Sequence, residues 1–188
     1  MYEFDLGAWS RQITTTSAAA QTWFDRGLNW TYAYNQEEAV ACFRKALEHD
    51  AECAMAWWGV AYANGPFYNR PWIRFTDSEI GETLPDCYSA AQAAAARLDR
   101  VTGAERALIA AIPIRFQSVG VTDRDTLNGW HEEFTAAMRL AHADYPDDLD
   151  IAALFAEAAV TCTPRQLWNL NTGEPNPSAH TVEVLAVL

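Results

Sequence analysis

Two tryptophans, Trp23 and Trp57, stand 34 residues apart, and each opens the same short pattern: a tryptophan, three residues, and then a glycine or an alanine. The small residues at Gly27 and Ala61 allow neighbouring helices to approach closely. A period of about 34 residues is typical of stacked pairs of antiparallel helices. The sequence therefore predicts an all-α chain of helix hairpins.

The spacing around the first tryptophan extends this pattern. Gly27, Trp30, Ala39, Phe43 and Ala46 follow the order W-x2-L-G-x2-Y and then A-x3-F, which is the tetratricopeptide-repeat consensus. The chain thus resembles a tetratricopeptide-repeat (TPR) protein, and the resemblance implies an α-α superhelix of antiparallel helix hairpins. Because such repeats act as scaffolds whose function depends on what their concave face binds, it implies no reaction.

A longer stretch resembles a narrower group of TPR-like proteins found in fungi and bacteria. The match is carried by Cys53, Ala54, Met55, Trp58, Gly59, Gly65, Pro66, Tyr68 and Asn69. Members of this group mostly have no assigned activity, so the resemblance implies the fold alone. They usually continue through further helices, and this chain is therefore expected to be a shortened member or a truncated form.

The composition indicates a single folded domain, and its negative charge disfavours binding to nucleic acid or to a membrane. Over 188 residues, 50% are hydrophobic and 20% are charged, which is enough to bury a core, so we expect a single TPR-like domain over residues 1–188. The formal net charge of -12 repels nucleic-acid phosphates and anionic lipids. With no leader-like segment and no apolar run of about 18 residues, we expect a cytoplasmic chain that binds neither nucleic acid nor membrane.

Helical periodicity sets the expected elements. We expect an extended lead-in over residues 1–16 and an inserted aromatic loop over residues 65–76, which breaks the repeat register. The expected helices cover residues 17–34, 36–49, 51–64, 77–101, 102–116, 125–144, 148–162 and, as a terminal helix, 178–188.

Three helix starts carry recognisable capping residues. Asn35 with Glu38, and Thr102 with Glu105, have the spacing in which a side chain accepts a backbone N–H and a carboxylate reaches back. Asp50 stands just before the helix expected over residues 51–64, and we expect it to cap that helix.

An aromatic groove is the main functional hypothesis. Aromatic residues concentrate in the first two hairpins and the inserted loop, where rigid rings can hold a peptide anchor, a flat apolar ligand or a cation. Arg70 in the loop is suited to an anionic group, and its alternative is a pair with a surface Asp or Glu, which we favour. The alternative is that these rings only pack helix against helix. The predicted ligand-binding residues are Trp30, Tyr34, Trp58, Tyr62, Phe67, Tyr68, Arg70 and Trp72.

The competing hypothesis is an enzyme of secondary metabolism with its active site in the same groove. Tyr68, Arg70, His131 or Glu133 would then move protons. For His131 and Glu133 we favour the alternative interpretation, in which they belong to a solvent-exposed helix face. Because no G-x-S-x-G, P-loop or dinucleotide motif is present, we favour a noncatalytic module without a cofactor that holds a protein segment or a small molecule.

The sequence does not predict a metal site. His131 and His142 stand eleven residues apart, which is about 16 Å along a helix and too far to share a metal. Asp147, Asp148 and Asp150 precede or begin a helix, where carboxylates favour its positive end. The cysteines lack CxxC spacing and are expected to be buried, reduced thiols: Cys42, Cys53, Cys87 and Cys162.

The terminal helix over residues 178–188 is strongly apolar. A solenoid needs a polar outer face on its last unit, so an apolar one predicts an interface. A self-complementary patch closes most simply about a twofold axis, and we therefore expect a homodimer through this helix. The apolar residues are Val182, Val184, Leu185, Val187 and Leu188.

Overall fold

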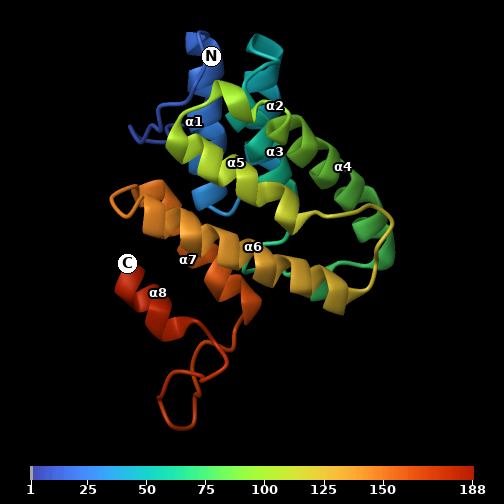
Figure 1. The fold of residues 1–188 in the computed structure, drawn as a ribbon, viewed down its shortest axis with the longest axis vertical. Coiled ribbons are helices and arrows are strands. Elements are labelled where there is room, and N and C mark those ends of the chain that lie inside the picture. Colours follow the sequence, from blue (N-terminus) through green and yellow to red (C-terminus); the bar gives the residue numbers. More distant parts are fainter. Residues whose placement is uncertain (1) are drawn as a thin grey trace. The chain divides into compact units, whose positions relative to one another are not determined.

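The computed structural model describes residues 2–188, and these form an all-α fold (Figure 1). No helix of this described part is long and apolar enough to cross a membrane. Strand-like pairing within the same residues consists of two isolated bridges in loops. The helices are α1 (Ala18–Tyr32), α2 (Gln36–His49), α3 (Ala54–Asn64), α4 (Asp77–Ala95), α5 (Gly103–Arg115), α6 (Arg124–Asp144), α7 (Leu149–Cys162) and α8 (Thr181–Val187), with short 3-10 turns η1 (Trp72–Arg74) and η2 (Leu98–Arg100).

The contacts group the chain into two compact units that interleave in sequence. Unit 1 comprises the residues up to Gly65 together with Asp86–Pro113, and unit 2 comprises Pro66–Pro85 together with Ile114–Leu188. Helices α4 and α5 each continue from one unit into the other. We expected one domain over residues 1–188, and each unit is described separately below.

The core of unit 1 forms where α2 packs against both α1 and α3. Phe43 of α2 is completely buried and lies against two glycines. A Cβ atom placed on Gly27 of α1 would lie 2.6 Å from the Phe43 ring, and one on Gly59 of α3 would lie 2.5 Å from it. The close approach predicted at Gly27 is therefore present. In α3 the contact is made at Gly59, while Ala61 is buried.

Two of the predicted caps are confirmed. The Asn35 side chain accepts the backbone N–H of Glu38 at the start of α2. At the start of α5, Thr102 Oγ1 accepts from the Glu105 backbone N–H, and the Glu105 carboxylate accepts from the Thr102 backbone N–H at 3.0 Å. Glu105 is buried and also accepts from the Thr14 backbone N–H (2.7 Å) and hydroxyl (2.6 Å). This one carboxylate thus fixes the lead-in to the first turn of α5.

The prediction that Asp50 caps the third helix is wrong. Helix α3 begins at Ala54 after Cys53, which makes no side-chain cap. Asp50 instead ends α2, and its carboxylate accepts the backbone N–H of Glu52 at 3.0 Å. The reason is that a short aspartate side chain can close a turn just after a helix as readily as it can open the next one.

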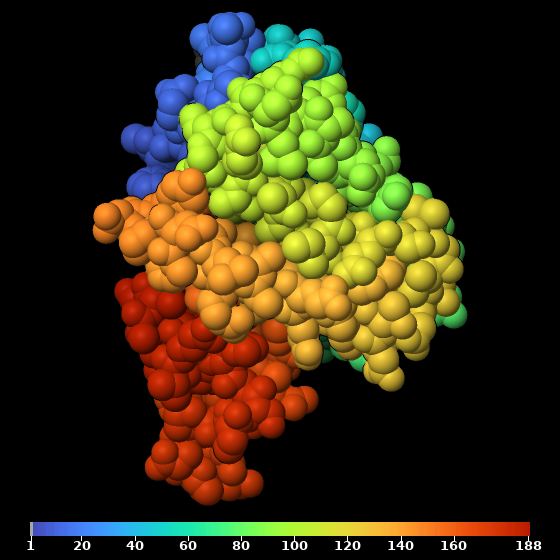
Figure 2. Space-filling view, in the orientation of Figure 1, coloured from blue at the N-terminus to red at the C-terminus, as the bar shows by residue number. Residues whose placement is uncertain are grey.

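In unit 2, helices α6 and α7 pack against each other, and α8 packs on α7. Helix α8 begins at Thr181, three residues after the expected start, and the Glu183 carboxylate receives two hydrogen bonds from Arg139 of α6, at 2.5 and 3.0 Å. The guanidinium of Arg115 is completely buried, donates to the Pro66 carbonyl and lies 4.9 Å from the Phe134 ring centre. The chain after α7 forms a continuous outer surface of this unit, seen in red in Figure 2.

Candidate functional site

A cleft of about 410 Å³ opens between three helices of unit 1. Its volume lies in the range of pockets that hold a side chain or a small ligand, about 300–1,000 Å³. Both apolar and charged side chains line it. The lining residues are Arg44, Leu47 and Glu48 of α2, Trp57 and Val60 of α3, and Asp86, Ser89 and Ala90 of α4.

Trp57 carries the largest side chain that lines this cleft, and its ring is fixed in position. Its indole N–H donates to the Ala51 carbonyl at 3.0 Å, and the Arg97 guanidinium lies 5.9 Å from the ring centre. Arg97 is itself held by Glu52 at 2.7 Å and by the Ala93 carbonyl at 2.8 Å. Because these contacts fix the ring before any ligand arrives, binding against it requires little additional ordering.

The charged groups of the cleft are paired at the protein surface. Arg44 of α2 and Asp86 of α4 form an ion pair, with about half of each side chain exposed, and Glu48 pairs with Lys45 at 2.8 Å. Exposed pairs of this kind contribute only about 0–1 kcal/mol each. A charged ligand can therefore exchange partners with them at low cost.

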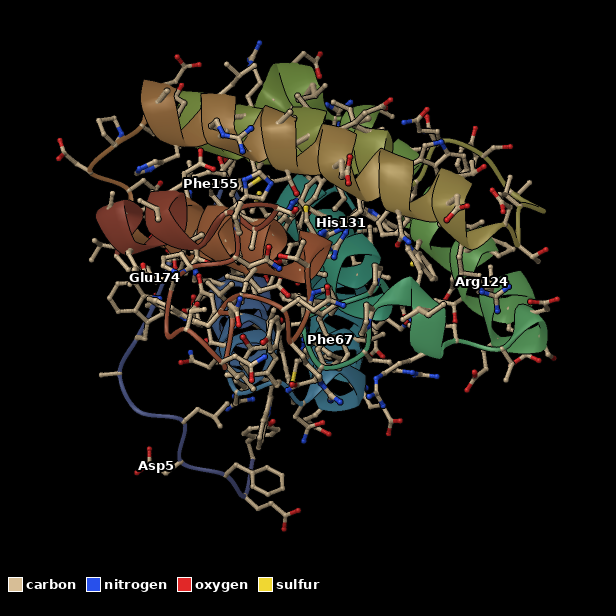
Figure 3. The ribbon with its side chains drawn as sticks, turned by 90° about the horizontal axis from the view of Figure 1, so that it is seen from below. Asp5, Phe67, Arg124, His131, Phe155 and Glu174 are labelled. Carbon is tan, nitrogen blue, oxygen red and sulfur yellow. The ribbon has the colours of Figure 1, made fainter. Side chains whose placement is uncertain are left out.

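Unit 2 contains a second, much smaller cavity of about 20 Å³, which is lined by both polar and apolar side chains. His131 of α6 lines it and is only 3% exposed, so the interpretation of His131 as part of a solvent-exposed face is wrong. Its Nε2 lies 3.0 Å from the Ala158 carbonyl of α7, the side of α6 on which Figure 3 shows the ring. Its Nδ1 is buried without a hydrogen-bond partner, as is the indole nitrogen of Trp72, which lines the same cavity.

Burial lowers the pKa of His131 to about 3, with a smaller contribution from the nearby Arg115 charge. The ring is therefore neutral at neutral pH. Since a carbonyl can only accept, Nε2 carries the proton and Nδ1 presents a lone pair. The cavity is large enough for one water molecule and no larger ligand.

The predicted groove residues of α3 are interior side chains. Trp58 and Tyr62 are 1% and 4% exposed and stack on each other, with ring centres 5.0 Å apart. The two rings therefore cover each other inside unit 1 and do not line a groove at its surface.

The predicted groove residues of the first hairpin lie at the surface of unit 1. Trp30 is half-buried, its ring meets Phe4 edge-on at 5.3 Å, and its indole N–H donates to the Tyr2 hydroxyl. Tyr34 is exposed and has a positive φ of 59° in the turn that follows α1.

The predicted loop residues belong to unit 2. Phe67 and Arg70 exchange backbone hydrogen bonds in a tight turn, and the Tyr68 backbone N–H donates to Glu157 at 3.0 Å. The Arg70 guanidinium lies over the Phe75 ring at 4.1 Å and pairs with Glu79 at 2.7 Å. Trp72 is 1% exposed and is part of the interior.

The residues that the enzyme hypothesis assigns to proton transfer each contact different groups. The Tyr68 hydroxyl accepts the Arg165 backbone N–H at 3.1 Å, and Glu133 receives a hydrogen bond from Gln117. Glu132, not Glu133, lines the cavity beside His131. Within residues 2–188, no three His, Cys, Asp or Glu side chains are grouped so that they could hold a metal ion.

The cleft residues were not among the predicted site residues. Trp57 stands at a repeat position, where a tryptophan ring normally packs helix against helix. The charged residues of α2 lie outside the apolar stripe that Ala39, Phe43, Ala46 and Leu47 form at helical spacing, which is typical of a solvated face. The one available signal was that Leu47 lies on that apolar stripe, with Arg44 and Glu48 beside it.

Comparisons with protein families, with curated proteins and with solved structures found no match to this chain.

Proposed function

We propose that the chain is a cytoplasmic helical binding module, and that the cleft between α2, α3 and α4 holds a short protein segment with a basic residue beside an apolar one. The observation that carries the proposal is the 410 Å³ cleft with a fixed tryptophan wall and two carboxylates. A lysine or arginine stem can lie along Trp57 and Leu47, while its charged end meets Glu48 or Asp86.

The charge of the whole chain supports a basic partner. A net charge of -12 attracts a cationic segment from a distance and speeds its encounter. Within the cleft, the carboxylates outnumber the single Arg44, which is itself paired with Asp86.

The TPR-like superhelix belongs to the same proposal. The support is the packing of α1, α2 and α3, in which Gly27 and Gly59 each meet Phe43. In this proposal α1 to α4 form two successive hairpins, and the surface they present is the binding surface, as it is in helical repeats.

The test is a titration with two blocked peptides, acetyl-Leu-Lys-Leu-amide and acetyl-Leu-Glu-Leu-amide. The signal is the indole N–H resonance of Trp57 in an NMR spectrum, assigned with a Trp57→Phe variant. The lysine peptide is expected to shift this resonance in a saturable and salt-sensitive way, and the glutamate peptide is expected to bind more weakly.

A matched pair of variants provides the control. Asp86→Arg reverses a cleft charge, whereas Asp99→Arg makes the same change of charge at an exposed position of η2 outside the cleft. Asp86→Arg should weaken binding of the lysine peptide about tenfold, the effect of about 1.4 kcal/mol, and Asp99→Arg should change it much less. Equal effects of the two variants would show that only the net charge matters and would contradict a role for the cleft.

A further inference from the structure

A second site of unit 1 already has an occupant, and the occupant is part of the chain itself. The segment before α1 has no regular secondary structure, and Tyr2 near its beginning packs on the outer surface of α1 and α2. Figure 3 shows Asp5 on this segment, lying away from the helices. The site is formed by Trp23, Arg26 and Trp30 of α1 with Glu38 of α2, and we name it the phenol cradle.

The phenol cradle contacts the Tyr2 ring in two ways, through an edge-on aromatic pair and through a cation over the ring face. Trp23 meets the ring edge-on, with ring centres 5.4 Å apart, and the Arg26 guanidinium lies 4.1 Å from the centre of the Tyr2 ring. Arg26 also lies 4.4 Å from the Trp23 ring. An edge-on aromatic pair and a cation over a ring face are both attractive arrangements for an aromatic ring of any kind.

The hydroxyl contacts are specific for a phenol. The Tyr2 hydroxyl donates to Glu38 Oε1 at 3.0 Å and accepts from the Trp30 indole N–H at 2.5 Å, and Cys42 Sγ lies 3.5 Å away. Only a group that both donates and accepts satisfies this pair of neighbours, and phenylalanine does neither. Burial raises the pKa of the Tyr2 phenol, which keeps it in the protonated form that donates to Glu38.

The connection between Tyr2 and the body of unit 1 allows the phenol to leave. After Tyr2 the segment meets unit 1 through the edge-on contact of Phe4 with Trp30, and then through hydrogen bonds in which the Trp9 carbonyl accepts from Asn29 and Ser10 and Arg11 donate to Asp25. Glu3, Phe4 and Asp5 are exposed, and Gly7 adopts a positive φ of 74° in a turn closed on Asp5. Such a connection holds Tyr2 at a local concentration of about the millimolar range, so a competing ligand displaces it by mass action.

We propose that the phenol cradle is a tyrosine-binding site that Tyr2 fills within the chain, and that it takes a tyrosine side chain of a partner protein when Tyr2 is withdrawn. Tyr2 thus acts as an internal competitor, and it raises the concentration of partner that is needed to occupy the phenol cradle. This proposal is independent of the cleft, because no residue lines both sites.

The probe is N-acetyl-tyrosinamide, and the signal is the indole N–H resonance of Trp30, which donates to the phenol in the structure. In the Tyr2→Ala variant the probe should shift this resonance in a saturable way. In the unsubstituted protein its apparent affinity should be about tenfold lower, because the tethered phenol competes. N-acetyl-phenylalaninamide should bind Tyr2→Ala about tenfold more weakly than the tyrosine probe, since it leaves Glu38 and Trp30 without partners.

Two variants distinguish binding in the phenol cradle from nonspecific binding of the probe to exposed aromatic side chains. Tyr34→Ala removes an exposed ring of unit 1 that is not among the cradle residues, and it should leave the competition intact. Glu38→Gln combined with Tyr2→Ala should reduce the preference for the tyrosine probe over the phenylalanine probe. The proposal is overturned if the tyrosine probe does not bind Tyr2→Ala, if the two probes bind it equally, or if Tyr2→Ala and the unsubstituted protein bind the probe alike.

Discussion

Phe43 of α2 lies against the backbones of two other helices, and it limits which residues α1 and α3 can carry. At Gly27 and Gly59 a Cβ atom would fall under 3 Å from the Phe43 ring. Other helical glycines, such as Gly129 of α6, have open space where a side chain would begin. Since the interior is close-packed, the same substitution has opposite consequences at these two kinds of position.

Gly27→Leu should destabilise the protein by about 1–3 kcal/mol, because overpacking forces the Phe43 ring and its neighbours to move. The matched variant Gly129→Leu should leave stability unchanged or raise it slightly, since leucine is a better helix former than glycine. Thermal melts followed by circular dichroism compare the two. A Gly27→Leu variant that melts like the unsubstituted protein would contradict the packing of Phe43 described above.

His131 should make the stability of the fold depend on pH. Its pKa is lowered to about 3 in the folded chain from the usual 6.5, so the unfolded chain takes up the proton first. The stability contributed by the neutral ring is complete above about pH 6.5 and is lost as the pH falls toward 3. Between about pH 6.5 and pH 5 this one group should reduce the free energy of unfolding by about 2 kcal/mol.

Urea unfolding of the unsubstituted protein and of His131→Gln at both pH values tests this expectation. The variant is expected to be less stable at neutral pH but to lose less on acidification. Contributions of carboxylates are common to both proteins and cancel in the difference. Equal losses on acidification would show that His131 titrates normally and is not enclosed.

At the scale of the helices, the sequence predicted capping hydrogen bonds correctly where the two residues of the cap stand three positions apart. Asn35 with Glu38, and Thr102 with Glu105, form their hydrogen bonds within one turn, so the spacing alone identifies them. Asp50 was predicted wrongly because two neighbouring turns compete for the same carboxylate. The burial of His131 was missed because it depends on which face of α6 meets α7, and the pattern of α6 alone does not decide this.

The two carboxylates that close capping boxes should differ sharply in importance. Glu105 is buried and accepts hydrogen bonds from both Thr102 and Thr14, whereas Glu79 is half-exposed and caps α4 through Thr76. Glu105→Ala should cost about 2–4 kcal/mol, because it leaves buried donors without partners. Glu79→Ala should cost about 1 kcal/mol. Chemical denaturation measures both, and equal costs would show that the bonds from Thr14 contribute nothing.

At the scale of the whole molecule, the helical class and the order of most helices followed from periodicity, but the grouping into two units did not. Periodicity reports which face of a helix is apolar, not which distant segment covers it. Unit 2 combines residues 66–85 with residues 114–188, and the choice between such pairings is made by packing between segments far apart in the chain. The cleft was missed for the same reason, because α4 contributes to it after a long loop.

Self-association through α8 is the prediction at this scale. Thr181 and Val184 are buried, while Val182, Leu185 and Leu188 are 65%, 63% and 81% exposed. We expect a symmetric dimer, because covering these exposed apolar side chains with a second copy removes them from water on both chains. Sedimentation of the unsubstituted protein against a Leu185→Asp, Leu188→Asp variant tests it. A monomer at micromolar concentration would contradict the prediction.

The interleaving of the two units has a consequence for the order in which the chain can fold as it is made. Unit 1 lacks its last segment until the ribosome has passed Pro113, and the first segment of unit 2, residues 66–85, emerges before that point. Those twenty or so residues, with the buried Trp72 and Phe75 among them, must wait for residues 114–188 before their apolar surface is covered. Chaperone occupancy during synthesis should therefore be highest while this interval is exposed, and a stop anywhere between Gly65 and Pro113 leaves both units incomplete.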